Sequence, residues 1–364
     1  MKNILNVILS FLDYITHIFP VKNNRIICSN FNGRKYDGNS KYFCEMLKDH
    51  YSNMEIYCLS KSNSFSNGIH YVKFPSIRAL YYFSTSKIWV SNVRLPIWIN
   101  KKKNQVYVQV WHGRGSFKKI EKLAGTALDN NYIKTAKKDS KQIDLLISPD
   151  KFDTNLLKKC FWYDGKIIEY NLSYKAKQKC KQNQKEISKK LRKAYGIKDN
   201  EKIILYAPTF RKYDYDYNIN MENINSNYKL FIKLHPGIKN LDIKMNNAIN
   251  VSDFASLDEL LVGCDILISD YSSIVYDYLF YNKEVYLYSP DYKDYAGERG
   301  FYIDYENMPF SISYSIEDLE KSINNQEYKK YEKQLDKYLK DNGLNKDNTM
   351  NLKKIFDFLD DKII

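Results

Sequence analysis

Residues 265–288 read DILISDYSSIVYDYLFYNKEVYLY and contain one complete strand–helix–strand pattern. The apolar runs Asp265–Ser269 and Glu284–Tyr288 have the length and the β-branched and aromatic content of buried strands. Between them, Ser272–Tyr281 is expected to form a helix. Because a strand that follows a crossover helix normally pairs in parallel, this stretch predicts an α/β protein with a parallel sheet.

The same alternation continues on both sides of this stretch. In the first half we expect strands at Arg25–Phe31, Met54–Leu59, Lys87–Ser91, Gln105–Val110, Ile143–Ser148 and Lys166–Glu169, and helices at Asn39–His50, Pro75–Ser84 and Lys151–Trp162. In the second half we expect further strands at Lys202–Ala207 and Lys229–Leu234, and a short helix that the capping box Ser256–Glu259 begins.

The chain therefore divides into two α/β halves. The Lys- and Gln-rich stretch Lys175–Lys193 is interpreted as an interdomain linker followed by a solvated helix from Lys185 to Tyr195. We predict an N-terminal helix at 1–20, Rossmann-like domains at 21–180 and 181–345, and a C-terminal helix at 346–364. A ligand cleft is expected between the domains, at the carboxyl ends of the strands.

The composition fits a protein of two domains. The chain has 364 residues, of which 44% are hydrophobic, and this excludes wholesale disorder. Its net charge of +14 favours anionic partners. Only eight of the 57 basic residues are Arg, so we attribute the charge to a general enrichment in Lys, and with no recognised motif we expect no nucleic-acid partner. The six Cys form no Cys-x-x-Cys or Cys/His cluster, so we expect no structural zinc site and a reducing compartment. We also expect no required metal and no cofactor.

The N-terminal segment has two interpretations. Residues 3–19 read NILNVILSFLDYITHIF, a run that is too short and too polar to span a membrane. As a helix it would place Ile4, Ile8, Phe11 and Ile15 on one broad apolar face, which suits a helix lying in a membrane interface. A helix packed on its own domain explains the same pattern, and the sequence leaves both readings open.

Two of the five histidines stand out by position. His112 and His235 each follow an expected strand and are flanked by Gly or Pro, and they lie in different halves of the chain. A histidine at such a place is often a satisfied structural residue, but the matched placement favours a function. With a pKa of about 6.5, histidine can take a proton from a hydroxyl or, once protonated, hold a phosphate.

A second cluster follows the strand Asp265–Ser269. Asp270, Ser272 and Ser273 precede the expected helix, where hydroxyls and free backbone N–H groups can bind an anion. Asp277 lies four residues after Ser273, on a similar helix face, and could accept hydrogen bonds from ribose hydroxyls. The alternative is an ordinary serine helix cap.

Arginine is scarce in this chain, so its positions are informative. Arg114, Arg211 and Arg299 fall in motif-like turns, and Arg34 follows Asn32-Gly33. The guanidinium group binds phosphate in a bidentate manner, although each of these residues could also be a plain surface arginine. Gly113 with Arg114 and Gly115 makes only a weak phosphate-loop pattern.

Several of these segments together resemble one known family, that of the CDP-glycerol glycerophosphotransferases of teichoic-acid and capsule biosynthesis. In chain order they are Phe31-Asn32-Gly33-Arg34, Asn39-Ser40-Lys41-Tyr42, Val108-Gln109-Val110-Trp111-His112-Gly113, Tyr206-Ala207-Pro208-Thr209-Phe210-Arg211, Lys233-Leu234-His235-Pro236, Ser269-Asp270-Tyr271-Ser272-Ser273 and Glu298-Arg299-Gly300-Phe301-Tyr302-Ile303-Asp304-Tyr305. The resemblance covers residues 25 to 310. Each motif is modest alone, and the order and spacing make the set specific.

The resemblance implies a GT-B fold, in which two Rossmann-like domains face a central cleft. It also implies an enzyme that needs no metal, lies peripherally on the cytoplasmic face of the cell membrane, and moves a polyol phosphate from a CDP-linked donor to a lipid-linked saccharide or polyol-phosphate acceptor. His112 would be the general base, and His235 would hold the donor pyrophosphate. The remaining donor-binding positions would be Arg211, Lys233, Asp270, Ser272, Ser273 and Asp277, with Gly113, Arg114, Arg299 and Arg34 as further phosphate or cleft candidates.

One motif of the family is altered. Where members usually carry a Gly-x-Pro-Arg-Asn-Asp turn, this chain has Glu169-Tyr170-Asn171-Leu172-Ser173-Tyr174, without the Pro and the Arg. CDP-ribitol is an alternative donor. A GT-B glycosyltransferase acting on a nucleotide sugar and a non-catalytic, membrane-bound polyanion-binding protein are alternative functions. The sequence leaves the acceptor, the number of additions and the oligomeric state open.

Overall fold

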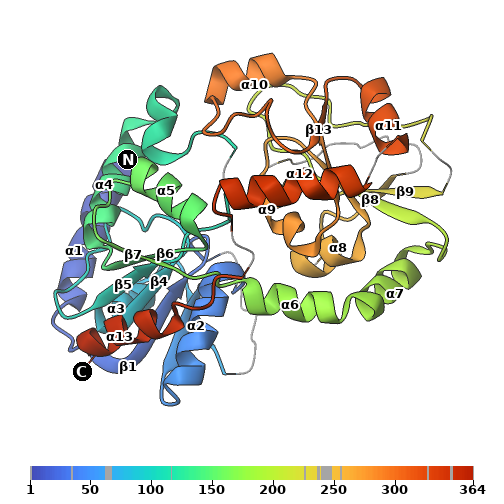
Figure 1. Cartoon of the computed structure of the whole chain (residues 1–364). Helices are drawn as coiled ribbons and strands as arrows, with labels where there is room; N and C mark the ends of the chain where they lie inside the picture. The colour runs from blue at the N-terminus through green and yellow to red at the C-terminus, as the bar shows by residue number, and fades with distance from the viewer. Residues whose placement is uncertain are drawn as a thin grey trace. The chain divides into compact units, whose positions relative to one another are not determined.

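The computed structural model describes residues 2–33, 36–61, 68–115, 117–224, 227–235, 238, 248–254, 256–325, 328–344 and 347–363. The chain forms two compact units (Figure 1). The first consists of Met1–His112, Glu121–Tyr174 and Asn345–Ile364, and the second of Gly113–Ile120 and Lys175–Leu344. Compared with the expected ranges 21–180 and 181–345, the short segment Gly113–Ile120 belongs to the second unit, and the C-terminal segment belongs to the first.

The first unit is built on a parallel sheet of seven strands in the order β3-β2-β1-β4-β5-β6-β7. The strands are β1 (Lys22–Ser29), β2 (Glu55–Ser60), β3 (His70–Lys73), β4 (Ser86–Ser91), β5 (Val106–Gln109), β6 (Leu145–Ser148) and β7 (Lys166–Glu169). The helices are α1 (Lys2–Thr16), α2 (Gly38–His50), α3 (Ile77–Thr85), η1 (Glu121–Ala127, a 3-10 helix), α4 (Asn130–Gln142), α5 (Lys151–Cys160) and α13 (Leu352–Ile363).

One face of this sheet forms an apolar core with α2 and α13. Phe43 and Leu47 from α2 and Ile355 and Leu359 from α13 are fully buried against the strands. The Tyr51 hydroxyl, just after α2, also donates to the Asp360 carboxylate. The apolar stripe of the C-terminal helix thus closes the core of the first unit, which is why the end of the chain returns there.

The second unit has a parallel sheet of six strands in the order β10-β9-β8-β11-β12-β13. The strands are β8 (Lys202–Tyr206), β9 (Tyr228–Ile232), β10 (Ala248–Asn250), β11 (Ile266–Ser269), β12 (Glu284–Tyr288) and β13 (Ser311–Ser313). The helices are α6 (Tyr174–Gln182), α7 (Gln184–Tyr195), α8 (Leu257–Gly263), α9 (Ile274–Tyr278), η2 (Leu279–Tyr281, a 3-10 helix), α10 (Tyr292–Arg299), α11 (Ile316–Asn324) and α12 (Tyr328–Asp341).

The predicted α/β class with parallel sheets is confirmed, and all ten expected strands are present within three residues at each end. Three observed strands were not expected from the sequence: β3, β10 and β13. Each lies at the edge of its sheet. Edge strands are short and partly exposed, so they lack the continuous apolar run that marks a central parallel strand.

The start of Lys175–Lys193, interpreted as a linker, is helix α6, and the longer segment of the second unit begins within this helix, at Lys175. Lys, Gln and Ala are good helix formers, so a Lys-rich stretch with little apolar surface can still be helical. A buried contact adds to this propensity: the Lys177 ammonium group of α6 forms an ion pair with the Asp277 carboxylate of α9. The predicted solvated helix that follows is α7, and Gly196 ends it in the left-handed conformation as expected.

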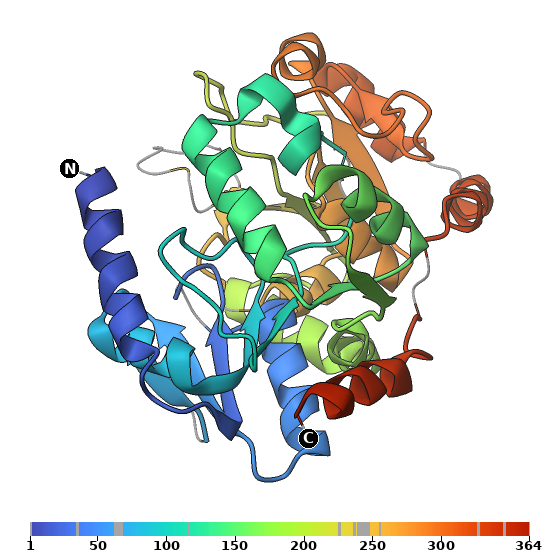
Figure 2. The ribbon, with the colours of Figure 1, turned by 90° about the vertical axis from the view of Figure 1, so that its left-hand side faces the viewer.

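Helix α1 lies along α3 at one side of the first unit (Figure 2). Asp13 is fully buried there and accepts hydrogen bonds from the backbone N–H and the side-chain amide of Asn100, at 3.0 and 2.8 Å. Thr16 is also buried, and its hydroxyl is hydrogen-bonded to that of Ser84. The opposite face of α1 and of the turn after it is apolar and exposed: Val7, Phe11 and Ile18 retain 69%, 64% and 76% of their accessible surface.

The two interpretations of the N-terminal segment, a helix packed on its own domain and a helix with an apolar face for a membrane interface, therefore each describe one face of α1. One face of α1 packs on the first unit, and the other face carries uncovered apolar side chains. Among the described residues, no helix has the length and apolar character that crossing a membrane requires.

Candidate functional site

His112 is the last residue of the first of the three segments that make up the first unit, and it lies just beyond strand β5. Its ring Nδ1 is 2.7 Å from the backbone carbonyl oxygen of Asn92, which follows strand β4. A carbonyl oxygen can only accept a hydrogen bond, so in the neutral ring the proton is on Nδ1 and the lone pair is on Nε2. In this tautomer, Nε2 can take a proton from a hydroxyl group.

The carbonyl that orients His112 is itself held by side-chain contacts. The Asn92 amide donates to Oδ1 of Asn30, at the end of β1, and its own Oδ1 accepts from the backbone N–H of Phe31 at 2.9 Å. The His112 ring lies between two aromatic rings, with centroid distances of 4.1 Å to Trp111 and 5.2 Å to Phe31. The ends of β1, β4 and β5 therefore fix one imidazole ring.

The backbone around this ring is strained. Phe31, Asn32 and Trp111 adopt left-handed φ angles of 44°, 51° and 44°, a region that costs residues with a side chain of order 1 kcal/mol or more. Asn39 of α2 supports the Trp111 turn, because its amide donates to the carbonyl oxygens of Val110 and Trp111 at 3.1 and 3.3 Å. Strain that surrounding contacts maintain at one strand end is typical of a functional position.

The segment after His112 is built into the second unit. Phe117 is fully buried, with its ring 5.1 Å from that of Tyr276. Its carbonyl oxygen accepts from the backbone N–H of Tyr302, and the N–H of Lys119 donates to the Gly300 carbonyl. The chain thus leaves the first unit directly after its candidate base and is anchored at once in the second.

Two glycines of this segment lie against α9 and the residue before it. Both have positive φ angles, 89° at Gly113 and 67° at Gly115. A Cβ atom at Gly113 would be 3.3 Å from the Ser273 hydroxyl oxygen, and one at Gly115 would be 2.3 Å from the Tyr276 ring. Gly113 and Ser273, which are both predicted site residues, therefore lie next to each other in the structure. Arg114, between the glycines, is buried in the second unit.

The predicted anion site at Ser272 and Ser273 rests on a shorter helix than expected. The sequence predicted a helix from Ser272 to Tyr281, but α9 covers only Ile274–Tyr278 and continues as the 3-10 turn η2. The Ser272 hydroxyl accepts from the N–H of Ile274 at 3.3 Å, and Ser273 makes no capping hydrogen bond. A helix of this length adds little macrodipole, so any anion binding here would come from hydroxyl and backbone N–H groups.

Asp277, the predicted ribose contact, is paired with a lysine that the sequence analysis missed. Oδ1 of Asp277 forms an ion pair with the Lys177 ammonium group, which is nearly fully buried. Lys177 stands in a stretch of many lysines, so no sequence signal distinguished it. The pair fixes one carboxylate oxygen of Asp277, which is half-buried.

Arg211, a predicted phosphate ligand, forms ion pairs with two carboxylates of the protein. Its fully buried guanidinium group donates from Nε and Nη2 to the two carboxylate oxygens of Asp291, at 2.6 and 3.0 Å. Nη1 lies 2.8 Å from Oδ2 of Asp270 and 2.7 Å from the Thr209 carbonyl oxygen. Although burial alone lowers the pKa of Arg211, hydrogen bonds to Asp291 and the charge of Asp270 raise it above its ordinary value.

Asp270 has a structural role as well. It is almost completely buried, and its carboxylate accepts from the backbone N–H and the hydroxyl of Thr209, and from the backbone N–H of Tyr271. Arg211 and Asp270 thus link the loop after β8 to the loop after β11 through protein partners, and their donor-binding roles stay predictions. Their polar patterns resembled binding residues because buried ion pairs use the same side chains.

The structure describes some of the remaining predicted residues and not others. His235 is exposed, after β9, with its ring 5.8 Å from that of Phe210. The ammonium group of Lys233 donates to the Ser252 carbonyl oxygen at 3.1 Å. Arg34, Pro236 and Gly237 lie outside the described residues, as does the side chain of Arg299. In the part of the chain that the structure describes, no group of three or more His, Cys, Asp or Glu could hold a metal ion.

Asn92 was missed by the sequence analysis, although a signal for it existed. It directly follows strand β4, which was expected at Lys87–Ser91, so the same rule that selected His112 applied to it. What could not be read from the sequence is that its backbone carbonyl, rather than its side chain, contacts the histidine.

Comparisons with known proteins give consistent results. Residues 11–358 match the sequence model of a family described as CDP-glycerol:poly(glycerophosphate) glycerophosphotransferase. A teichoic acid poly(glycerol phosphate) polymerase from Bacillus spizizenii is 31% identical over 333 residues, which cover 84% of this chain and 84% of that protein. One from Staphylococcus epidermidis is 30% identical over 332 residues, which cover 84% of this chain but 46% of that protein. The chain thus spans about half the length of the staphylococcal relative.

A solved structure extends the similarity to the whole fold. The wall teichoic acid polymerase TagF, solved as a variant soaked with CDPG, superposes with a TM-score of 0.81 at 27% sequence identity. The match covers 100% of this chain and 95% of that one. Both sheets of the present chain therefore have counterparts in one known transferase structure.

Proposed function

Because the chain belongs to the CDP-glycerol:poly(glycerophosphate) glycerophosphotransferase family, we propose that it transfers glycerol phosphate from CDP-glycerol to an acceptor hydroxyl and releases CMP. Its membership confirms the resemblance read from the sequence, the GT-B-like fold class and the transferase class. The acceptor is proposed to be a lipid-linked saccharide or a growing teichoic acid or capsule polymer.

The observation that carries the chemical proposal is the contact between His112 Nδ1 and the Asn92 carbonyl. It leaves the Nε2 lone pair to receive the proton of the acceptor hydroxyl. The hydroxyl oxygen then forms a bond to the β-phosphorus of CDP-glycerol. The bond from that phosphorus to the bridging oxygen breaks, and CMP leaves with the bridging oxygen.

The donor is proposed to bind in the second unit. His235 and Lys233, after β9, would hold the pyrophosphate by charge, and the hydroxyls of Ser272 and Ser273 would donate to its oxygens. Asp277, with one carboxylate oxygen fixed by Lys177, would accept from ribose hydroxyls with the other. Arg211 and Asp270 would support the loops that carry these groups.

A donor screen tests this proposal. Purified protein is expected to release CMP from CDP-glycerol in the presence of a glycerol-phosphate-primed lipid acceptor, and to release little from CDP-ribitol or from nucleotide sugars. Release of CMP from CDP-ribitol at a higher rate would assign the ribitol-phosphate reaction. Release of a nucleoside diphosphate from a nucleotide sugar would contradict the whole assignment.

We further propose that the exposed face of α1 binds the cytoplasmic face of the cell membrane, as a peripheral contact. The uncovered apolar side chains of this face can enter the acyl boundary, while Asp13 and Thr16 keep the helix docked. The ammonium group of Lys102, from a different segment, donates to the Phe19 carbonyl oxygen just after α1 and adds positive charge for anionic lipids.

Serine substitution of Val7, Phe11 and Ile18 together is expected to lower binding to phosphatidylglycerol vesicles by at least tenfold. Each removed side chain contributes about 1.5–3 kcal/mol when it is fully buried in an apolar medium. Co-sedimentation with vesicles measures the effect, and circular dichroism checks the fold. Met350→Ser, which removes a side chain of 93% exposure on a different segment, is the matched control. Equal binding by the triple variant and the control would contradict the proposal.

A further inference from the structure

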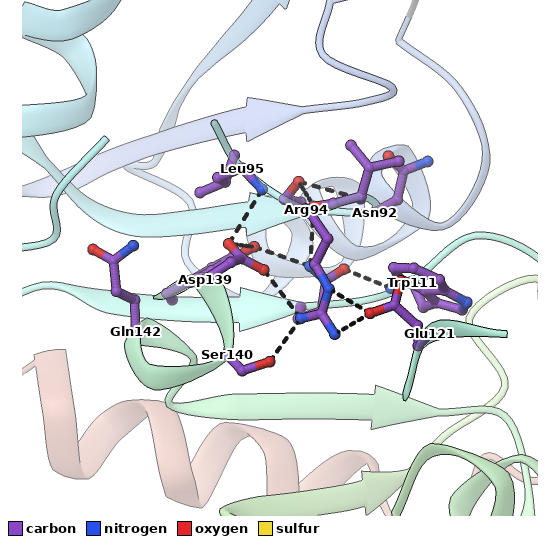
Figure 3. A network of polar contacts seen from close by, with 12 residues as sticks. Asn92, Arg94, Leu95, Trp111, Glu121, Asp139, Ser140 and Gln142 are labelled. Atoms are coloured by element: carbon purple, nitrogen blue, oxygen red, sulfur yellow. Dashed lines mark hydrogen bonds and ion pairs between the residues drawn. The ribbon is translucent and has the colours of Figure 1, made fainter. Parts of the chain in front are cut away.

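A buried ionic network lies beside Trp111, the residue before His112, in the first unit (Figure 3). The Arg94 guanidinium group donates from Nη2 and Nε to Oε2 of Glu121, at 2.7 and 3.0 Å. Its Nη1 donates to Oδ2 of Asp139 at 3.2 Å and to the Ser140 hydroxyl at 3.0 Å. Burying each of these three charges costs several kcal/mol before the charges pair. Apolar side chains of similar size would often stabilise the core at least as much as such a network does. This network therefore raises the question of what else it does.

A chain of hydrogen bonds leads from this network to the turn that carries His112. The Tyr107 hydroxyl donates to Oδ1 of Asp139 at 3.1 Å, and it accepts from Nε2 of Gln109 at 2.9 Å. Oδ1 of Asp139 also accepts from the backbone N–H of Leu95. Oε1 of Gln109 accepts from the backbone N–H of Trp111 at 2.9 Å. Tyr107 and Gln109 are fully buried, so water does not compete for these bonds.

Every donor in this chain points toward the Asp139 carboxylate. Trp111 donates to Gln109, Gln109 to Tyr107, and Tyr107 to Asp139. Hydrogen bonds arranged in one direction polarise one another, so the carboxylate strengthens the bond at the far end. The side-chain amide of Gln109 has a defined orientation, because its Nε2 also donates to the Val93 carbonyl oxygen.

Trp111 connects these hydrogen bonds to the His112 ring. Its backbone N–H is held by Gln109 while its φ angle is in the left-handed region. Its indole ring is 4.7 Å from the Phe161 ring, and the Arg94 guanidinium group lies 5.7 Å from the indole and 4.0 Å from Phe161. The Trp111 ring also contacts the His112 imidazole, with 4.1 Å between the ring centroids. Both the backbone and the ring of Trp111 are thus fixed by the network.

We propose that Asp139, Tyr107 and Gln109 form a positioning relay that holds the Trp111 turn in its strained conformation, and so aims the His112 imidazole for proton transfer. None of the three touches the substrate, and each acts through Trp111. The inference rests on the proposed role of His112. Misplacement of a reacting group by about 1 Å costs up to a hundredfold in rate, which gives a relay of this kind a measurable effect.

Tyr107→Phe tests the relay, because it removes one hydroxyl and keeps the ring. The variant is expected to show a kcat about ten- to a hundredfold below the parent, with an unchanged KM for CDP-glycerol. The matched control is Tyr163→Phe, in the same unit. Its hydroxyl also takes part in two hydrogen bonds, to the backbone carbonyl oxygens of Asp144 and Lys166 at 3.1 and 3.0 Å, and neither partner is one of the three relay residues. The control is expected to keep the parental kcat.

Gln109→Met provides a second interruption in case Tyr107→Phe is poorly folded. It is expected to give the same loss of kcat at constant KM. The relay proposal would be overturned if either variant were folded and had the parental kcat. It would also be overturned if Tyr163→Phe lost as much kcat as the relay variants at an equal loss of melting temperature. His112→Ala separates the two proposals: if it is inactive while both relay variants are fully active, only the relay fails. If His112→Ala is itself active, the proposed base is wrong.

Discussion

Replacement of His112 by alanine is expected to lower kcat by about 10²- to 10⁴-fold. The Nε2 lone pair, which the contact of Nδ1 with the Asn92 carbonyl leaves on that nitrogen, takes up charge only as the hydroxyl proton moves. The lost interaction therefore belongs to the transition state, and the affinity for CDP-glycerol should stay close to that of the parent. Steady-state rates and calorimetric titration of CDP-glycerol measure the two quantities separately.

His235→Ala is the informative counterpart. Because His235 is proposed to hold the donor pyrophosphate, this variant should bind CDP-glycerol more weakly, whether or not kcat also falls. His70→Ala is the control, since His70 is exposed on the edge strand β3 with its ring stacked on Tyr57, and it should behave as the parent. Loss of donor binding in His112→Ala with normal binding in His235→Ala would require the two roles to be exchanged.

Arg211→Met is expected to destabilise the protein by about 3–5 kcal/mol, because removing one partner of a buried ion pair leaves the other charges uncompensated. Asp270 and Asp291 would both remain, with side-chain exposures of 1% and 9%. The cation also packs against the rings of Tyr215, Tyr271 and Tyr295, within 4.9 Å of each centroid. Urea unfolding followed by tyrosine and tryptophan fluorescence measures the change in midpoint.

The effect of Arg211→Met should depend on pH in a defined direction. Although burial alone raises the pKa of Asp291, hydrogen bonds from Arg211 and Tyr213 lower it below its ordinary value. A carboxyl group with a lowered pKa in the folded state stabilises the fold above its unfolded pKa of about 3.9, and this stabilisation is lost as the pH falls through the folded pKa. The difference between parent and variant should therefore be full at neutral pH and shrink in acid.

Arg78→Met is the matched control for Arg211→Met. Arg78 is exposed, with its guanidinium group 5.7 Å from the ring of Tyr82, and loss of a surface arginine changes stability by about 0.5 kcal/mol or less. An Arg211 variant with the parental midpoint but no affinity for CDP-glycerol would restore Arg211 as a phosphate ligand. The structural role requires the opposite pattern, a lower midpoint in the absence of any ligand.

Local patterns in the sequence determined the fold class, ten of the strands and the positions of His112, Ser272 and Ser273. A buried parallel strand needs a continuous apolar run, and the residue after it reaches the carboxyl edge of the sheet. Both properties depend on neighbours in the chain, so they can be read in order from residues such as Val106–His112. The edge strands β3, β10 and β13 were not predicted from the sequence, because half-exposed strands do not need continuous apolar runs.

Only the tertiary structure decided which polar residues are engaged by the protein itself. Arg211 and Asp270 read as ligands in the sequence, yet Asp291, which lies 80 positions after Arg211, occupies the guanidinium group. The His112 tautomer depends on a backbone carbonyl 20 positions earlier, and Lys177 meets Asp277 across 100 positions. An ionised or hydrogen-bonding side chain pairs with any suitable group that the fold places within about 3 Å of it. Which group lies at that distance depends on how the strands and helices pack, and not on the order of residues along the chain.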